Sequence, residues 1–348
     1  MIAPKSRCLR VKQAGPGATL QDAGRFGYLR YGVTPAGPMD FAAFRTANFA
    51  LGNDAGAAAV EIAAGGLEVI CEGAPLWLAF AGGAFLWQRD GAGLPHAARI
   101  YLKTGERLAA RAGAFGAFAY LAAAGGFDTP LVMGSRATHT RSGLGGLNGR
   151  MLEEGDLLPI AEAEAVPDFE AAIAAPWLAR DCDPIRVVLG PQEDYFSAQA
   201  RALFFDSEYR LTPAADRMAY RFQGPEIEAS QGHDIVSDGV ALGAIQIPGD
   251  RQPLVLMADR QPTGGYPKIA HVIGADLPAL AQKRPGDLVE FAAVSWEEAV
   301  AVRRERARLI SAGVKLSALA RHDFSSAFLL ERNLVGGVIS AKQAPLVD

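Results

Sequence analysis

Residues 253–287 read PLVLMADRQPTGGYPKIAHVIGADLPALAQKRPGD. A β-rich run at 254–257 leads into a turn in which charged residues surround a glycine pair. The residues of this turn that we predict to form a site are Asp259, Arg260, Gly264, Gly265, Tyr266 and Lys268. Glycine permits a positive φ and lets a backbone pass close to a ligand. Charges on both sides of such a pair therefore predict a binding site as well as a turn.

The same layout occurs earlier in the chain, within residues 119–160. Gly125-Gly126-Phe127 matches Gly264-Gly265-Tyr266, and Gly155-Asp156-Leu157 matches Gly286-Asp287-Leu288. The earlier copy contains an extra loop, GLGGLNG, at residues 143–149. A self-match at so long a spacing indicates two related domains and not a solenoid of short repeats.

The chain has 348 residues, which is too long for one ordinary core and suits two domains. Many short β-rich runs between Gly/Pro turns predict a mainly β fold with a few helices, of the barrel or sandwich type. The predicted boundaries are 1–165 for the N-terminal domain, 166–183 for a linker, 184–295 for the C-terminal domain, and 296–348 for a C-terminal helix and tail.

Local signals define several elements. Strands are predicted at 67–71, 76–80, 118–122, 185–189, 253–257 and 288–294. A glycine followed by an acid opens three strands, at Gly105, Gly155 and Gly286, and predicts a tight turn before each. Helices are predicted to begin after the caps Asp40, Ser197 and Ser295 and to end near Leu51, Phe205 and Gly313.

Composition excludes several classes of protein. The net charge of −4 and the pI near 5.8 argue against a nucleic-acid binder. No apolar run approaches the ~20 residues that cross a bilayer, and the first residues lack the apolar core of a secretion signal. Three widely separated cysteines do not suggest a disulfide framework. We therefore expect a cytoplasmic protein that binds neither nucleic acid nor membrane.

Several standard motifs are missing. The chain has no GxxxxGK[ST] sequence for ATP, no GxSxG nucleophile and no HExxH pair, and its five histidines are scattered. We therefore predict no metal site. No lysine stands between two methionines, the usual attachment site of biotin, so biotin would have to arrive on another protein.

Polar residues gather in turns bounded by glycine and proline. Taken singly, each fits a turn cap or a structural ion pair, but together they exceed what turns require. They are Asp40, Asn48, Asn53 and Glu61 in the first half, and Asp216, Arg217, Arg221, Asp238 and Gln246 in the second.

Long strings carry a family resemblance. They include TLQDAGRFGYLRYGVTPAGPMD, GPQEDYF, DRMAYRFQG, SDGVALGAIQIPGDRQPLVLMADRQPTGGYPKIAHVIGADL and LAQKRPGDLVEF. The chain resembles the biotin-dependent carboxyltransferase-type family over residues 8–295. That family includes KipA, the C-type component of 5-oxoprolinase, subunit 2 of allophanate hydrolase and the carboxyltransferase region of urea carboxylase. The resemblance implies two cyclophilin-like β-barrel domains, which agrees with the duplication.

The resemblance also implies partners and a reaction. Members work with a KipI-like protein as the B-type component, and 5-oxoprolinase adds a LamB/YcsF-type protein as the A-type component. The implied function is ATP-dependent hydrolysis of a cyclic amide, with ATP as the cofactor and the chain active only with its partners. Two alternatives remain open: a carboxyltransferase-type protein that acts on urea, allophanate or another small amide, and a KipA-like regulatory binding protein.

Such chemistry needs an acid/base group and cations beside a planar amide. We predict Asp259 and Lys268 as catalytic residues, with Lys268 holding a phosphate or carboxylate charge. The predicted substrate-binding residues are Arg260, Gly264, Gly265, Tyr266, Asp40, Asn48 and Arg217. Arg260 or Arg217 would bind a substrate carboxylate, and the glycine backbone would supply oxyanion donors.

Overall fold

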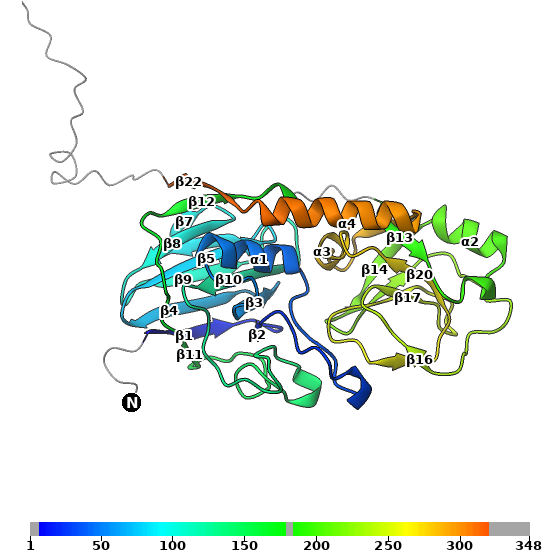
Figure 1. The fold of residues 1–348 in the computed structure, drawn as a ribbon, viewed down its shortest axis with the longest axis horizontal. Helices are drawn as coiled ribbons and strands as arrows, with labels where there is room; N and C mark the ends of the chain where they lie inside the picture. The colour runs from blue at the N-terminus through cyan, green and yellow to red at the C-terminus, as the bar shows by residue number, and fades with distance from the viewer. Residues whose placement is uncertain (1–6, 179–183, 320–348) are drawn as a thin grey trace, which may run out of the picture.

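The computed structural model, which describes residues 7–178 and 184–319, shows two β-rich halves side by side (Figure 1). The first half packs two sheets against each other, and the second half is a closed barrel. Helix α4 (Trp296–Ser311) runs along both halves and leads the chain back to the first (Figure 1). The predicted class, mainly β with a few helices, is confirmed.

The first half contains a six-stranded and a seven-stranded sheet. In spatial order the six-stranded sheet is β11 (Leu157–Pro159), β1 (Arg7–Ala14), β4 (Leu67–Gly73), β9 (Arg107–Arg111), β6 (Leu86–Arg89) and β7 (Ala92–Leu94). The seven-stranded sheet is β2 (Thr19–Gln21), β3 (Ala59–Ala63), β10 (Phe118–Ala123), β5 (Leu76–Gly82), β8 (Ala98–Leu102), β12 (Ala171–Ala174) and β22 (Lys315–Ala318).

Strand β10 is buried on both faces, which explains its continuous apolar sequence. Leu121 belongs to the core between the two sheets, where Phe80 and Trp87 stack with ring centroids 4.0 Å apart. The alternate residue Tyr120 faces a second core. That second core continues into the barrel, so the two halves are joined by apolar packing.

The second half forms a seven-stranded closed barrel. Its strands in order are β13 (Ile185–Leu189), β20 (Lys268–Val272), β17 (Ala244–Gln246), β18 (Leu254–Leu256), β15 (Ala219–Gln223), β14 (Glu208–Ala215) and β21 (Leu288–Ala293). Closure comes from the parallel pair β13–β21. A separate two-stranded ribbon, β16 (Asp238–Gly239) with β19 (Thr263–Gly264), lies outside the barrel.

The two halves differ in how their sheets close. The duplication predicts a barrel in each half, but within the described residues only the second half forms a closed ring of hydrogen-bonded strands. In the first half the edge strands β11 and β7 belong to one sheet, and β2 and β22 to the other. The two sheets are therefore held together by side-chain packing and not by a continuous ladder.

The three Gly-acid turns are built alike, which confirms that prediction. Gly105, Gly155 and Gly286 have φ of 86°, 91° and 99°, a region that favours glycine. Each glycine N–H donates to one residue of a neighbouring strand, and that residue's N–H donates back to the carbonyl of the following acid. The strand partners are Cys71, Val11 and Leu211.

The helices begin at their predicted caps. The Asp40 carboxylate accepts from the N–H of Ala43 at the start of α1 (Phe41–Ala50). Ser197 caps α2 (Ala198–Phe205), and Ser295 forms a capping box with Glu298 on α4. The remaining helical segments are α3 (Leu277–Ala281), η1 (Leu29–Tyr31), η2 (Thr140–Ser142), η3 (Pro176–Leu178) and η4 (Glu193–Tyr195). No helix of the described residues is long and apolar enough to cross a membrane.

The domain boundaries remain a prediction. The strand pairing shows which sheet the predicted linker and tail join. Strand β12, within the predicted linker, pairs with β8, and β22, within the predicted tail, pairs with β12. Both segments therefore extend a sheet of the first half. Cys182 and residues 320–348 lie outside the described residues, whereas Cys8 and Cys71 are buried and free.

Candidate functional site

A buried ion cluster joins the two halves, and Arg217 is at its centre. Arg217 lies in the turn between β14 and β15 and donates from Nε and Nη2 to both oxygens of Asp259, at 2.9 and 2.8 Å. Its Nη1 donates to Glu61 of the first half, and its Nη2 also donates to the carbonyl of Gly37, at 2.7 Å. These contacts take four of the five N–H groups of the guanidinium.

Glu61 connects this cluster to the sheet of the first half. It lies on β3, is fully buried, and accepts hydrogen bonds from the N–H of Met39 at 2.8 Å and the hydroxyl of Tyr120 at 2.7 Å. The Tyr120 hydroxyl in turn accepts from the N–H of Asp40, at 2.7 Å. Every oxygen of the Glu61 carboxylate is thus satisfied, as buried charge requires.

Asp40 makes a second contact between the halves. While its Oδ1 caps α1, its Oδ2 accepts from Nε2 of Gln282 at 2.8 Å. The Gln282 amide also bonds the N–H and the carbonyl of Phe118, at 3.0 and 2.9 Å. Predicted site residue Asp40 therefore caps α1 with one carboxylate oxygen and contacts the second half with the other.

The electrostatics of the cluster follow from burial and charge. Burial alone would lower the pKa of Arg217, but Glu61 and Asp259 outweigh it and raise that pKa well above its ordinary value. Burial, followed by the nearby Glu61 charge, raises the pKa of Tyr120. Both groups therefore keep their protons at any physiological pH, and the cluster acts as a fixed arrangement of charge.

Replacing Tyr120 with phenylalanine is expected to lower the free energy of unfolding by about 1–3 kcal/mol. The change leaves the ring packing and removes the one group that links Glu61 to the Asp40 backbone. Urea denaturation measures the loss. Tyr101→Phe is the control, because Tyr101 is half-buried on β8 of the same sheet, and it should change stability by less than about 0.5 kcal/mol. Equal values for the two variants would contradict the prediction.

Lys268 forms an ion pair with an aspartate of the two-stranded ribbon. It lies on β20, is 1% exposed, and its Nζ donates to Oδ2 of Asp238 at 2.7 Å. Asp238 belongs to the two-stranded ribbon, and its side chain is 54% exposed. Hydrogen bonds from Lys268 and from the Gly239 backbone lower the pKa of Asp238. Lys268 is therefore a buried cation with its anion at the surface.

Arg260 is buried near the same ribbon. It is 8% exposed, and its Nε donates to the carbonyl of Val240 at 3.0 Å. Burial lowers its pKa. Arg260 follows Asp259 in sequence, but the structure pairs Asp259 with Arg217. Neighbouring side chains in a turn point in different directions, so adjacency in sequence did not identify the partner.

The second glycine pair does not adopt the positive φ of the first, and only Gly264 of this pair is closely packed. Gly125 and Gly126 have φ of 93° and 78°, whereas Gly264 and Gly265 are not among the glycines of positive φ. A Cβ on Gly264 would lie 2.6 Å from Nε2 of Gln246, so a larger residue there would require that amide to move. Tyr266 is 37% exposed, and its carbonyl accepts from the same Nε2 at 3.4 Å.

Asn48 has a structural environment. Its side chain is fully buried in α1, donates to the carbonyl of Ala57 at 2.9 Å and accepts from Asn53. The predicted site residues thus form two groups: Asp40, Arg217 and Asp259 between the halves, and Arg260, Gly264, Gly265, Tyr266 and Lys268 around the ribbon. Their roles in binding and catalysis stay predictions.

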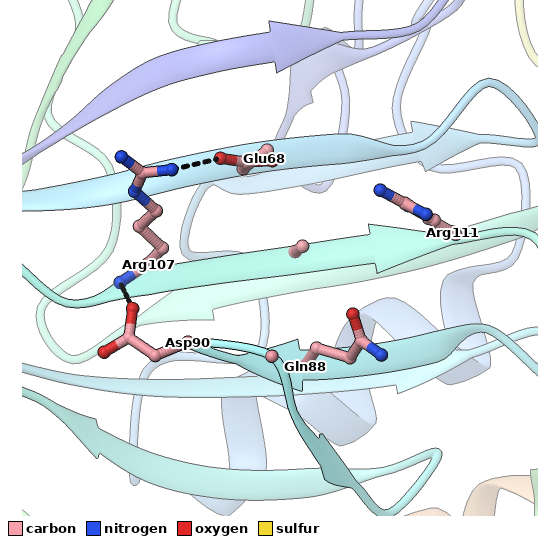
Figure 2. Close-up of a pocket in the computed structure, with 7 residues that line it drawn as sticks. Glu68, Gln88, Asp90, Arg107 and Arg111 are labelled. Carbon is pink, nitrogen blue, oxygen red and sulfur yellow. Dashed lines mark hydrogen bonds and ion pairs between the residues drawn. The ribbon is translucent and has the colours of Figure 1, made fainter.

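A groove of about 340 Å³ lies elsewhere, on the outer face of the six-stranded sheet (Figure 2). There Arg107 pairs with Glu68 at 3.7 Å, and its N–H donates to Asp90 at 3.0 Å (Figure 2). The Arg107 side chain is 59% exposed. Exposed charges that satisfy one another offer little to a reaction, so we do not place the site here.

The chain is similar to proteins of one known family. Residues 31–293 match the profile described as carboxyltransferase domain, subdomain A and B. The chain belongs to this carboxyltransferase family. It is 37% identical to the 5-oxoprolinase C subunit of Escherichia coli over 301 residues, which are 86% of this chain and 96% of that protein. The corresponding Haemophilus influenzae protein is 37% identical over 83% of this chain and 92% of its own length.

Solved structures of family members agree with the fold. The Kluyveromyces lactis urea carboxylase superposes with a TM-score of 0.82 at 29% identity, covering 88% of this chain. The chain spans 29% of that urea carboxylase and 20% of the K. lactis urea amidolyase, which has the same TM-score and 30% identity. In these larger carboxyltransferase-family proteins the fold is one part of a longer chain.

Sequence reasoning missed several polar partners. Tyr120 lies in an apolar strand, where nothing in the sequence separates a hydroxyl that bonds Glu61 from a ring that only packs. Gln282 and Gln192 lie in the strings LAQKRPGD and GPQEDYF, and the backbone N–H of Lys268 donates to Gln192 at 3.3 Å. Both strings carry the family resemblance. Membership in these strings was the only sequence signal that pointed to the two glutamines.

Proposed function

We propose that this chain is the C-type subunit of an ATP-dependent 5-oxoprolinase. The observation that carries the proposal is the share of each relative's length that this chain matches. The match extends over 96% and 92% of the two bacterial 5-oxoprolinase C subunits, but over only 17% of the yeast urea amidolyase. The chain therefore corresponds in extent to a separate subunit of this kind.

The residues around the ribbon suit such a substrate. 5-Oxoproline is a cyclic amide that carries a carboxylate, and an ATP-dependent route adds a phosphate charge. Lys268 and Arg260 are buried cations, and a desolvated cation binds an oxyanion more strongly than an exposed one. We propose that these two side chains hold the anionic groups, with the backbone near Gly264 and Gly265 as oxyanion donors.

The cluster at Arg217 is proposed to hold the two halves in register around that site. Because Arg217 already binds Asp259 and Glu61, it is a poor candidate for a substrate carboxylate. Asp259 remains the proposed acid/base residue next to Arg260, and its pair with Arg217 fixes it in position.

The proposed assembly contains a KipI-like protein as its B-type component and a LamB/YcsF-type protein as its A-type component. Support comes from the designation of the bacterial relatives as one subunit of a larger enzyme and from the missing nucleotide motif in this chain. ATP would be used by the complex, and the chain alone is expected to be inactive. Biotin is not expected to be attached to this chain.

A second candidate is a carboxyltransferase-type role on urea or allophanate. The observation that favours it is the TM-score of 0.82 with a urea carboxylase over 88% of this chain. This role would require a carrier protein that brings carboxybiotin to the site. The two candidates therefore differ in co-substrate as well as in amide.

Reconstitution distinguishes the candidates. The chain is co-expressed with the KipI-like and LamB/YcsF-type proteins of the same genome, and ATP hydrolysis is measured with and without 5-oxoproline, urea or allophanate. We expect a joint peak in size exclusion and hydrolysis that depends on 5-oxoproline and on this chain. Separate peaks at micromolar concentration, or stimulation by urea alone, would contradict the 5-oxoprolinase assignment.

A further inference from the structure

The pair Lys268–Asp238 is asymmetric in burial. The Lys268 side chain is 2% exposed, whereas that of Asp238 is 54% exposed. A buried ammonium needs an anion, but an exposed carboxylate loses little on returning to water. The partner of Lys268 is therefore one that another anion can replace at small cost.

A second cation borders the same ribbon segment. Arg260 Nε bonds the carbonyl of Val240, two residues after Asp238. Within residues 7–178 and 184–319, the salt bridges include none for Arg260. Residues 238–240 thus contact two buried cations, and their one carboxylate is bonded to Lys268.

Gln246 adds an unsatisfied polar atom at this place. It lies on β17 opposite Lys268, is fully buried, and its Oε1 has no hydrogen-bond partner in the described part of the chain. Its Nε2 makes only a long contact of 3.4 Å with the Tyr266 carbonyl. The unpartnered atom is an acceptor, so it can take a hydrogen bond from an N–H or O–H group of a ligand but does not itself bind an oxyanion.

In the described residues the ribbon shares no strand pairing with the barrel. Strands β16 and β19 have two residues each and pair only with one another. The neighbouring Val236 is 92% exposed. The segment that carries Asp238 can therefore shift without breaking the barrel ladder, whereas Lys268 is fixed within it.

We propose that Asp238 is a placeholder ligand: its carboxylate occupies the position at the Lys268 ammonium that a carboxylate or phosphate oxyanion takes on binding, with Arg260 as the second cation. The inference rests on the proposed function for the identity of the substrate, but the placeholder itself requires only an oxyanion. Asp238 thus keeps the buried lysine paired while the site is empty, and competes with the incoming anion.

Because Asp238 and the anion compete for Lys268, the proposal predicts the direction in which anion affinity changes when Asp238 is replaced. If Asp238 occupies Lys268 in about 90–99% of molecules, the observed affinity for an anion is lower than the intrinsic one by about 10- to 100-fold. Removing the carboxylate should therefore strengthen anion binding. A residue that only supports the fold, or one that binds substrate directly, would have the opposite effect when it is removed.

The experiment is isothermal titration calorimetry on the full chain at constant ionic strength, with inorganic phosphate and 5-oxo-L-proline as separate probes. We expect Asp238→Ala and Asp238→Asn to bind at least one probe about 10-fold or more tightly than the parent. Lys268→Met should bind both probes more weakly. Asp250→Asn, which removes the carboxylate of a similarly exposed partner of Arg221, should leave both affinities unchanged.

The outcomes separate the two ideas. Unchanged or weaker binding of both probes by both Asp238 variants, with melting curves that show folded protein, overturns the placeholder. Stronger phosphate binding without 5-oxoproline binding in any variant supports the placeholder and counts against the proposed substrate. Stronger binding of 5-oxoproline supports both.

Discussion

Arg217→Met is expected to lower the free energy of unfolding by about 3–5 kcal/mol, because it leaves two buried carboxylates without their cation. Glu61 is fully buried and the side chain of Asp259 is 8% exposed, so neither can recover much hydration. Methionine retains most of the side-chain volume, so the loss of unfolding free energy measures the effect of the missing charge and not that of a cavity. Urea denaturation followed by tryptophan fluorescence measures it.

Arg221→Met is the matched control. Arg221 lies four residues further along and pairs with Asp250, but the two side chains are 42% and 46% exposed. An exposed pair contributes about 0–1 kcal/mol, so this variant should remain close to the parent. A loss for Arg217→Met no larger than that for Arg221→Met would show that the cluster does not hold the halves together.

Lys268→Met is expected to lower turnover of the reconstituted complex by about 100-fold, the order for one lost electrostatic contact in the transition state. Methionine is preferred to alanine because Lys268 is buried in the barrel wall, and alanine would open a cavity there. The rate of 5-oxoproline-dependent ATP hydrolysis at saturating substrate is the measurement.

Lys103→Met provides the comparison, since Lys103 is exposed in a turn of the first half. It should retain parental activity and stability within about 0.5 kcal/mol. Full activity of folded Lys268→Met would mean that the lysine pairs with Asp238 for structural reasons alone. A loss of activity together with a loss of the joint size-exclusion peak would instead place the effect on assembly.

Local sequence predicted those elements that depend on neighbouring residues. Caps at Asp40, Ser197 and Ser295 work through backbone N–H groups three residues away, so the helix starts followed from sequence. The Gly-acid turns followed for the same reason, since the acid binds the N–H of the residue three positions before it. The β-rich runs also became strands at the predicted places.

By itself, the sequence thus determined a mainly β chain, its local caps and turns, and its family. Tertiary structure decided which charges meet. Asp259 pairs with Arg217, 42 residues away, and Arg217 reaches Glu61 in the other half, 156 residues away. Lys268 meets Asp238 because a short ribbon folds over the barrel. Such contacts depend on how strands pair and close a barrel, and pairing is a property of the whole chain that no local pattern contains.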